Sequence, residues 1–86
     1  MASIDEVRAG IGQANDKAQE SLSALQQAHS SLEQAQSLLQ QTTDGSSQAD
    51  VNEANGLLQQ AISSIDEVQQ NVNAAIQAAE GVQARL

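Results

Sequence analysis

Apolar residues recur alternately three and four positions apart along two stretches of this 86-residue chain, and this spacing restricts the fold more than any other feature. A seven-residue repeat of this kind places an apolar stripe along an α-helix, and the stripe must pack against another helix. The first stripe, with one polar member, comprises Ile4, Val7, Ile11, Ala14, Ala18, Ser21, Leu25, Ala28, Leu32, Ala35 and Leu39. The second comprises Val51, Ala54, Leu58, Ala61, Ile65, Val68, Val72, Ala75, Ala79, Val82 and Leu86. We therefore predict helices over residues 3–42 and 48–86.

The residues between the two stripes favour a turn. Residues 42–47 read Thr-Thr-Asp-Gly-Ser-Ser, a concentration of turn-forming types that occurs nowhere else in a chain without proline. In an antiparallel pair the numbers of facing residues have a constant sum. Taken alternately, the stripe residues form two sets of facing pairs: one runs from Ile4 with Leu86 to Leu39 with Val51, and the other from Val7 with Val82 to Ala35 with Ala54. Both sets are centred on Asp44 and Gly45. The sequence thus predicts a turn over 43–47 and a single all-α domain over 1–86, an antiparallel two-helix hairpin of coiled-coil type.

A capping signal marks the expected start of the first helix. Ser3 and Glu6 form the Ser-x-x-Glu pattern in which the serine hydroxyl accepts a hydrogen bond from a free backbone amide of the first turn. We expect the first helix to begin at this serine.

Charge and hydropathy exclude several classes of partner. Eleven Asp and Glu residues against three Lys and Arg give a net charge of -8, which repels phosphate backbones and argues against nucleic-acid binding. Uninterrupted apolar runs are no longer than three residues, so neither a membrane span nor the apolar segment of a signal peptide is predicted. We expect the protein to be made in the cytoplasm.

No set of residues forms a convincing chemical site. His29 and Glu33, one helical turn apart, could offer two metal ligands, but the chain has no cysteine and no second histidine to complete a zinc site. The acidic residues Asp66 and Glu67 are neighbours that point in different directions around a helix, and a two-helix rod offers no pocket in which they could act as a catalytic pair. We predict no catalytic, cofactor or metal residues, no small-molecule substrate and no enzymatic activity.

Apolar residues outside the stripes indicate a surface for a partner. Leu22, Ile62 and Ile76 lie on one flank of the predicted stripes, and Leu38 and Leu57 lie on the other, near the turn. A two-layer hairpin leaves such residues partly in water, whereas stable domains bury them against a further element. We expect these five residues to contact either a second copy, giving a four-helix bundle or a higher assembly, or a different helical protein.

Two short segments resemble motifs of the small WxG helical-hairpin proteins exported by bacterial type VII secretion systems. Residues 43–45, Thr-Asp-Gly, stand where the family has Trp-x-Gly at its bend, keeping the glycine but not the tryptophan. Ile76 and Glu80 stand where it has an export signal of Tyr-x-x-x-Asp/Glu, keeping the acid but not the tyrosine. The resemblance implies a dimerising hairpin that leaves the cell without a cleaved signal peptide and acts as a secreted partner or adaptor.

A structural role is the alternative. Heptads rich in Ala, Gln, Asn and Ser with few charges are also similar to the coiled-coil parts of filament subunits. Such a subunit packs its hairpin laterally against many copies. Both alternatives remain open from the sequence.

Overall fold

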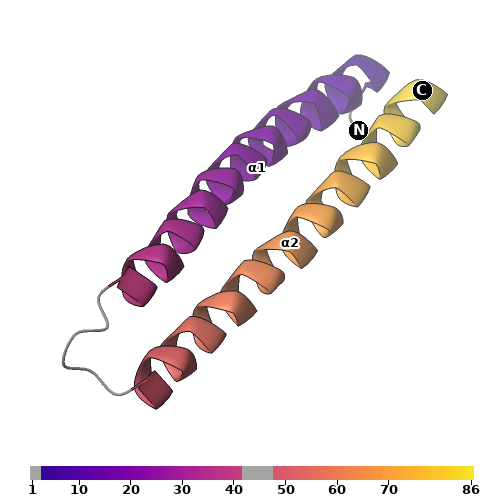
Figure 1. Ribbon diagram of the computed structural model, residues 1–86. Helices are drawn as coiled ribbons and strands as arrows, with labels where there is room; N and C mark the ends of the chain where they lie inside the picture. Colours follow the sequence, from indigo (N-terminus) through magenta and orange to yellow (C-terminus); the bar gives the residue numbers. More distant parts are fainter. Residues whose placement is uncertain (1–2, 42–47) are drawn as a thin grey trace.

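Two long α-helices lie side by side in the computed structural model, which describes residues 3–41 and 48–86 (Figure 1). Helix α1 spans Ile4–Gln41 and helix α2 spans Gln48–Arg85. The start of α1 and the end of α2 lie at the same end of the rod, so the helices are antiparallel. The all-α helical hairpin predicted from the sequence is confirmed. The turn predicted at Asp44 and Gly45 lies outside the described residues.

The N-terminus of α1 is capped by the residue that precedes it. Ser3 Oγ accepts a hydrogen bond from the backbone amide of Glu6 at 3.1 Å, and the Ser3 carbonyl accepts one from the amide of Val7 at 3.0 Å. Asp5 and Glu6 place two carboxylates in this first turn, where the helix dipole favours negative charge. The serine half of the predicted capping pattern therefore forms, and α1 begins one residue after Ser3.

The molecule is too slender to enclose a large core. Its extents are 65, 18 and 15 Å, so the rod is one helix thick and two helices wide. Within the described residues the buried hydrophobic side chains are those of Val51, Ile62 and Ile76, all on α2, and no side chain is completely removed from solvent. A single small core of this kind rarely supplies more than about 3–5 kcal/mol of stability.

Polar residues cover most of the circumference of both helices. The mean hydropathy of the chain is -0.39. Neither α1 nor α2 contains a stretch apolar enough to cross a membrane, over the residues that the structure describes.

One of the two predicted sets of stripe residues lies between the helices, as expected. We call this the first set; its members are buried or half-buried everywhere except at the open end of the rod, where Ile4 and Leu86 are exposed. The enclosed members are Ile11, Ala18, Leu25, Leu32 and Leu39 on α1 and Val51, Leu58, Ile65, Val72 and Ala79 on α2. The seven-residue periodicity of the interhelical interface is thereby confirmed.

The other predicted set is enclosed only in part, because each helix is rotated about its axis relative to the prediction. Its half-buried members are Val7, Ala35, Ala54 and Ala61. The structure leaves Ala14, Ser21, Ala28, Val68, Ala75 and Val82 exposed. The residues one position later take their place and are buried or half-buried: Asn15, Leu22, His29 and Gln36 on α1, and Asn55, Ile62, Gln69, Ile76 and Gln83 on α2. This arrangement keeps the same seven-residue period.

The size of the side chains explains the rotation. Burying a branched side chain such as Ile62 or Ile76 contributes roughly 1.5–3 kcal/mol, more than burying an alanine. That gain outweighs the cost of placing several amide side chains in the interface, where they are only half-buried. Leu22, Ile62 and Ile76 were expected on an open flank for a partner; this expectation is corrected, since all three belong to the contact between α1 and α2.

Candidate interaction surface

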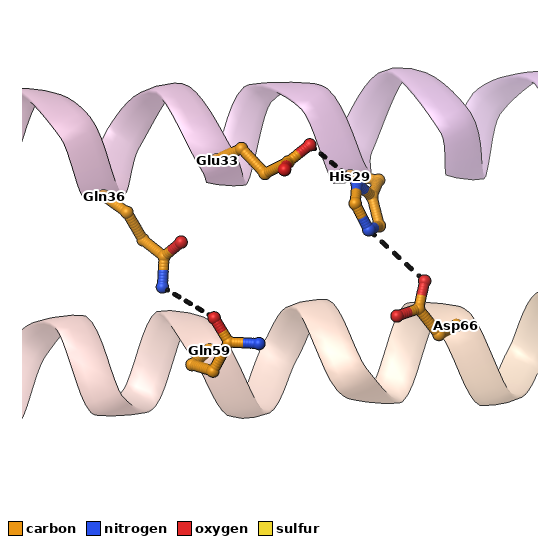
Figure 2. Close-up of polar contacts among 5 residues, drawn as sticks. All are labelled: His29, Glu33, Gln36, Gln59 and Asp66. Atoms are coloured by element: carbon orange, nitrogen blue, oxygen red, sulfur yellow. Dashed lines mark hydrogen bonds and ion pairs between the residues drawn. The ribbon is translucent and has the colours of Figure 1, made fainter.

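One edge of the interhelical interface is polar, and its side chains bridge the two helices (Figure 2). His29 Nδ1 lies 3.0 Å from Glu33 Oε1 on the same helix, and His29 Nε2 lies 3.3 Å from Asp66 Oδ1 on α2. Further along, Gln36 Nε2 donates to Gln59 Oε1 at 3.2 Å. We call this side of the hairpin the polar edge.

Two glutamine side chains fix the register of the helices. Gln36 Nε2 also donates to the backbone carbonyl of Asn55 at 3.3 Å, and Gln83 Nε2 donates to the carbonyl of Arg8 at 3.2 Å. The residue numbers of the two pairs have the same sum, so one register holds from near the bend to the open end. These bonds also give the amide groups at the interface a partner that an apolar neighbour would not provide.

The polar edge does not form a metal site. Over the described residues, no group of three or more His, Cys, Asp or Glu side chains is arranged to hold a metal ion. His29 and Glu33 face each other, as their spacing of one helical turn predicted. His29 also contacts Asp66 on α2. The contact between His29 and Asp66 was not predicted from the sequence.

The opposite side of the hairpin carries small apolar side chains from both helices. On each helix, the residue three positions after each member of the first set, such as Ala14 after Ile11, lies on one flank of the interface. The residue one position after each member, such as Asp66 after Ile65, lies on the other flank. Gln59 and Asp66 belong to the second flank and make the polar-edge contacts, so the first flanks of α1 and α2 lie together on the other side. We call this surface the alanine face; its exposed members are Ala14, Ser21, Ala28, Val68, Ala75 and Val82.

Larger apolar side chains extend the alanine face. Val68 and Val82 are 44% and 40% exposed, and Leu38 and Leu57, which follow Ala35 and Ala54 by three positions, are 61% and 59% exposed. Leu38 and Leu57 are thus open to solvent near the bend, where we expected them. Apart from those at the open end, the exposed large hydrophobic side chains of the described residues all lie on or beside this face.

Few charges lie on the alanine face. Lys17 borders it on α1 and forms an ion pair with Glu20 at 3.4 Å, while Asp50 and Arg85 lie near its two ends on α2. The other acidic residues of the described helices lie on the polar edge or on the outer sides, away from the partner helix. The face is therefore an apolar strip on an otherwise acidic molecule.

The residues that resemble an export signal have contrasting environments. Ile76 is buried between the helices, and Glu80, one turn later, is exposed. Only the carboxylate of this pair is accessible on the isolated hairpin.

Comparison of the chain with protein-family models, with curated proteins and with solved structures found no match.

Proposed function

We propose that this protein is a non-enzymatic helical interaction protein that binds a helical partner or itself through its apolar surface. The observation that carries the proposal is the alanine face, an apolar strip along a hairpin whose own interface encloses few side chains. Exposed apolar surfaces rimmed by polar residues are typical of protein–protein contact sites.

Within this class, we propose a small secreted or adaptor protein similar to those of bacterial type VII secretion. The support is the small acidic chain without cysteine, folded as a helical hairpin, together with the glycine at position 45 and the exposed Glu80. Export would occur without a cleaved signal peptide. The proposal places the export determinant on the surface around Glu80 and not on the buried side chain of Ile76.

A structural subunit of a filament is the second candidate, favoured by a specific observation. Ile4 and Leu86 are exposed at the open end of the rod, so the described residues carry a second exposed apolar surface in addition to the lateral alanine face. A molecule that binds its neighbours through two different surfaces can add copies without closing into a ring, which gives a filament. Electron microscopy of concentrated protein distinguishes the candidates, because fibres favour the filament and discrete particles favour the adaptor.

Partner capture tests the proposal. The tagged chain is expressed in the cells that naturally produce it, and the proteins that co-purify are identified by mass spectrometry. We expect a helical protein, or the untagged chain itself, to be retained by the wild type and lost from a variant with Ala28→Glu and Ala75→Glu on the alanine face. The control carries Gln26→Glu and Asn73→Glu on the opposite side, which add the same charge. Retention of nothing by the wild type, or of the same protein by all three chains, would contradict the proposal.

Export is tested separately. We expect Glu80→Gln to reduce the amount of protein in the culture medium, whereas Glu67→Gln, an equal loss of charge on the same helix, should leave it unchanged. Equal export of both variants would remove the secretion part of the proposal and leave the adaptor part standing.

A further inference from the structure

We infer that Asn55 is a site of spontaneous chemical modification, and that its product prevents the hairpin from closing. The reaction converts the asparagine to aspartate or isoaspartate with loss of ammonia, and it takes place while the two helices are apart. This inference does not depend on the partner proposed above. Three observations support it: the residue that follows Asn55, the burial of its side-chain amide, and the small core of the hairpin.

The residue after Asn55 is a glycine, and none of the other four asparagines of the chain precedes a glycine. Loss of ammonia requires the backbone nitrogen of the following residue to reach the side-chain carbonyl carbon of the asparagine. Gly56 has no side chain to obstruct this approach, and its backbone adopts conformations that other residues avoid. Asn55 is therefore the asparagine of this sequence with the least hindered reaction.

The reaction is an intramolecular substitution followed by hydrolysis. The nitrogen of Gly56 forms a bond to Cγ of Asn55, the bond between Cγ and Nδ2 breaks, and ammonia leaves with the proton of the Gly56 amide. Water then opens the resulting succinimide ring. Breaking the new bond from Cγ to nitrogen gives aspartate, whereas breaking the original peptide bond gives isoaspartate, in which the main chain passes through Cγ. Water is the only other reactant, and nothing is oxidised or reduced.

The folded hairpin protects Asn55 from this reaction. Both residues of the pair lie within α2, where each backbone amide donates to the carbonyl four residues earlier, so the nitrogen of Gly56 is held in the helix and cannot reach Cγ. From α1, Gln36 Nε2 also holds the carbonyl of Asn55. A hairpin with so small a core is open in roughly one molecule in 10² to 10⁴. Folding should therefore slow the reaction by about that factor.

The product does not fit the place that the Asn55 side chain occupies. Nδ2 and Oδ1 of Asn55 are both buried, and neither has a hydrogen-bond partner. A carboxylate there would lose its hydration, and burying a charge without a partner costs far more than burying an amide. Glu33 lines the same hollow between the helices, so a second negative charge would repel it. Isoaspartate would in addition lengthen the backbone of α2 by one carbon and interrupt its hydrogen bonds.

Modification therefore proceeds in one direction. An open chain with an intact Asn55 closes again, whereas a chain that has lost ammonia at this residue stays open. The amount of product records how long the molecules have spent open. A partner that binds only the closed hairpin would slow the reaction by lowering the open fraction.

Mass spectrometry of the purified full-length chain tests the site. The chain is incubated at mildly alkaline pH, with and without enough urea to unfold it, and each loss of ammonia is located by fragmentation. In urea we expect Asn55 to react before the other four asparagines, and Gly56→Ala to abolish this preference. Without urea the rate at Asn55 should fall by roughly 10² to 10⁴. Equal rates at all asparagines in urea, or a rate at Asn55 that folding leaves unchanged, would overturn the inference.

The variant Asn55→Asp tests the effect of the product directly. The matched control is Asn52→Asp, the same change at an exposed residue of α2 whose side-chain oxygen can still accept a hydrogen bond from Gln48. In urea unfolding followed by circular dichroism, we expect the folding equilibrium constant of Asn55→Asp to be at least about tenfold smaller than that of the control. An Asn55→Asp hairpin as stable as the control would also overturn the inference.

Discussion

Replacing Ile62 by valine tests the rotation of the helices that the structure shows. The substitution removes one methylene from a side chain that is 5% exposed. If the interface followed the positions predicted from the sequence, Ala61 would take the buried place and Ile62 would lie on an open flank. The matched control is Ile4→Val, the same chemical change at a residue that is 55% exposed. Ile65→Val, at a half-buried member of the first set, provides an intermediate case.

The expected magnitudes follow from the exposure of each side chain. Burying a methylene contributes about 0.8 kcal/mol, and Ile→Val changes in cores cost about 0.5–1.5 kcal/mol. We therefore expect Ile62→Val to lower the free energy of unfolding by about 1 kcal/mol and the melting temperature by about 4–8 °C. Ile4→Val should cost less than about 0.4 kcal/mol, because half of its side chain is in water in the folded state. Any difference in helix propensity between isoleucine and valine applies to all three sites and does not affect their order.

The assay is thermal and urea unfolding followed by far-UV circular dichroism. All proteins are compared at one concentration, because association of copies would raise the apparent stability. The order of destabilisation should be Ile62, then Ile65, then Ile4. A cost at Ile4 equal to that at Ile62, or no cost at Ile62, would refute the rotated interface and restore the one predicted from the sequence.

Three further changes test local features of the hairpin by the same unfolding assay. Gly56→Ala should stabilise the protein by about 1 kcal/mol, since a Cβ at this position meets nothing within 4 Å and alanine is the better helix former; a loss of stability would contradict a regular helix there. Asn55→Leu should stabilise it by at least about 1 kcal/mol, because the buried Nδ2 and Oδ1 atoms of Asn55 have no hydrogen-bond partner; a destabilised variant would indicate that the amide is satisfied. Ser3→Ala should cost about 1 kcal/mol through loss of the bond to the Glu6 amide; an unchanged melting temperature would argue against the cap.

The helical hairpin was predictable because its evidence is repeated along the chain. The first set, from Ile11 to Leu39 and from Val51 to Ala79, is spaced as a helix requires and leaves no competing period. Periodicity alone does not define the rotation of a helix, however. At each repeat within the helices the residue three positions after a member of the first set, which is an alanine, a serine or a valine, competes for burial with the residue four positions after that member. Both choices have the same period.

The outcome of that competition depends on side-chain volumes and on hydrogen bonds across the interface. Ile62 and Ile76 gain more from burial than Ala61 and Ala75. The cost of enclosing Gln36 and Gln83 falls because their amides reach backbone carbonyls on the other helix. These carbonyls are accessible only in the folded register, so the sequence pattern could not reveal them.

The candidate surface was predicted only in part, because the rotation of each helix decides which apolar residues are exposed. The exposure of Leu38 and Leu57 agrees with the expectation, and their contact with a partner stays a prediction. The structure instead encloses Leu22, Ile62 and Ile76 between the helices. The apolar surface is formed by the smaller residues of the alanine face. An apolar surface made mostly of alanine is difficult to identify from sequence, because alanine is equally common on solvent-exposed helical faces.

The antiparallel register has a consequence for the order in which the hairpin folds. The hydrogen bond between Gln36 and Asn55 closes a short segment of chain, whereas the bond between Gln83 and Arg8 closes nearly the whole chain. Because the entropy lost on closing a loop grows with its length, pairing begins beside the bend and proceeds like a zipper toward the termini. Opening follows the reverse path, starting where Ile4 and Leu86 are exposed. Amide hydrogen exchange should therefore be fastest at the termini and slow progressively toward the layer of Val51.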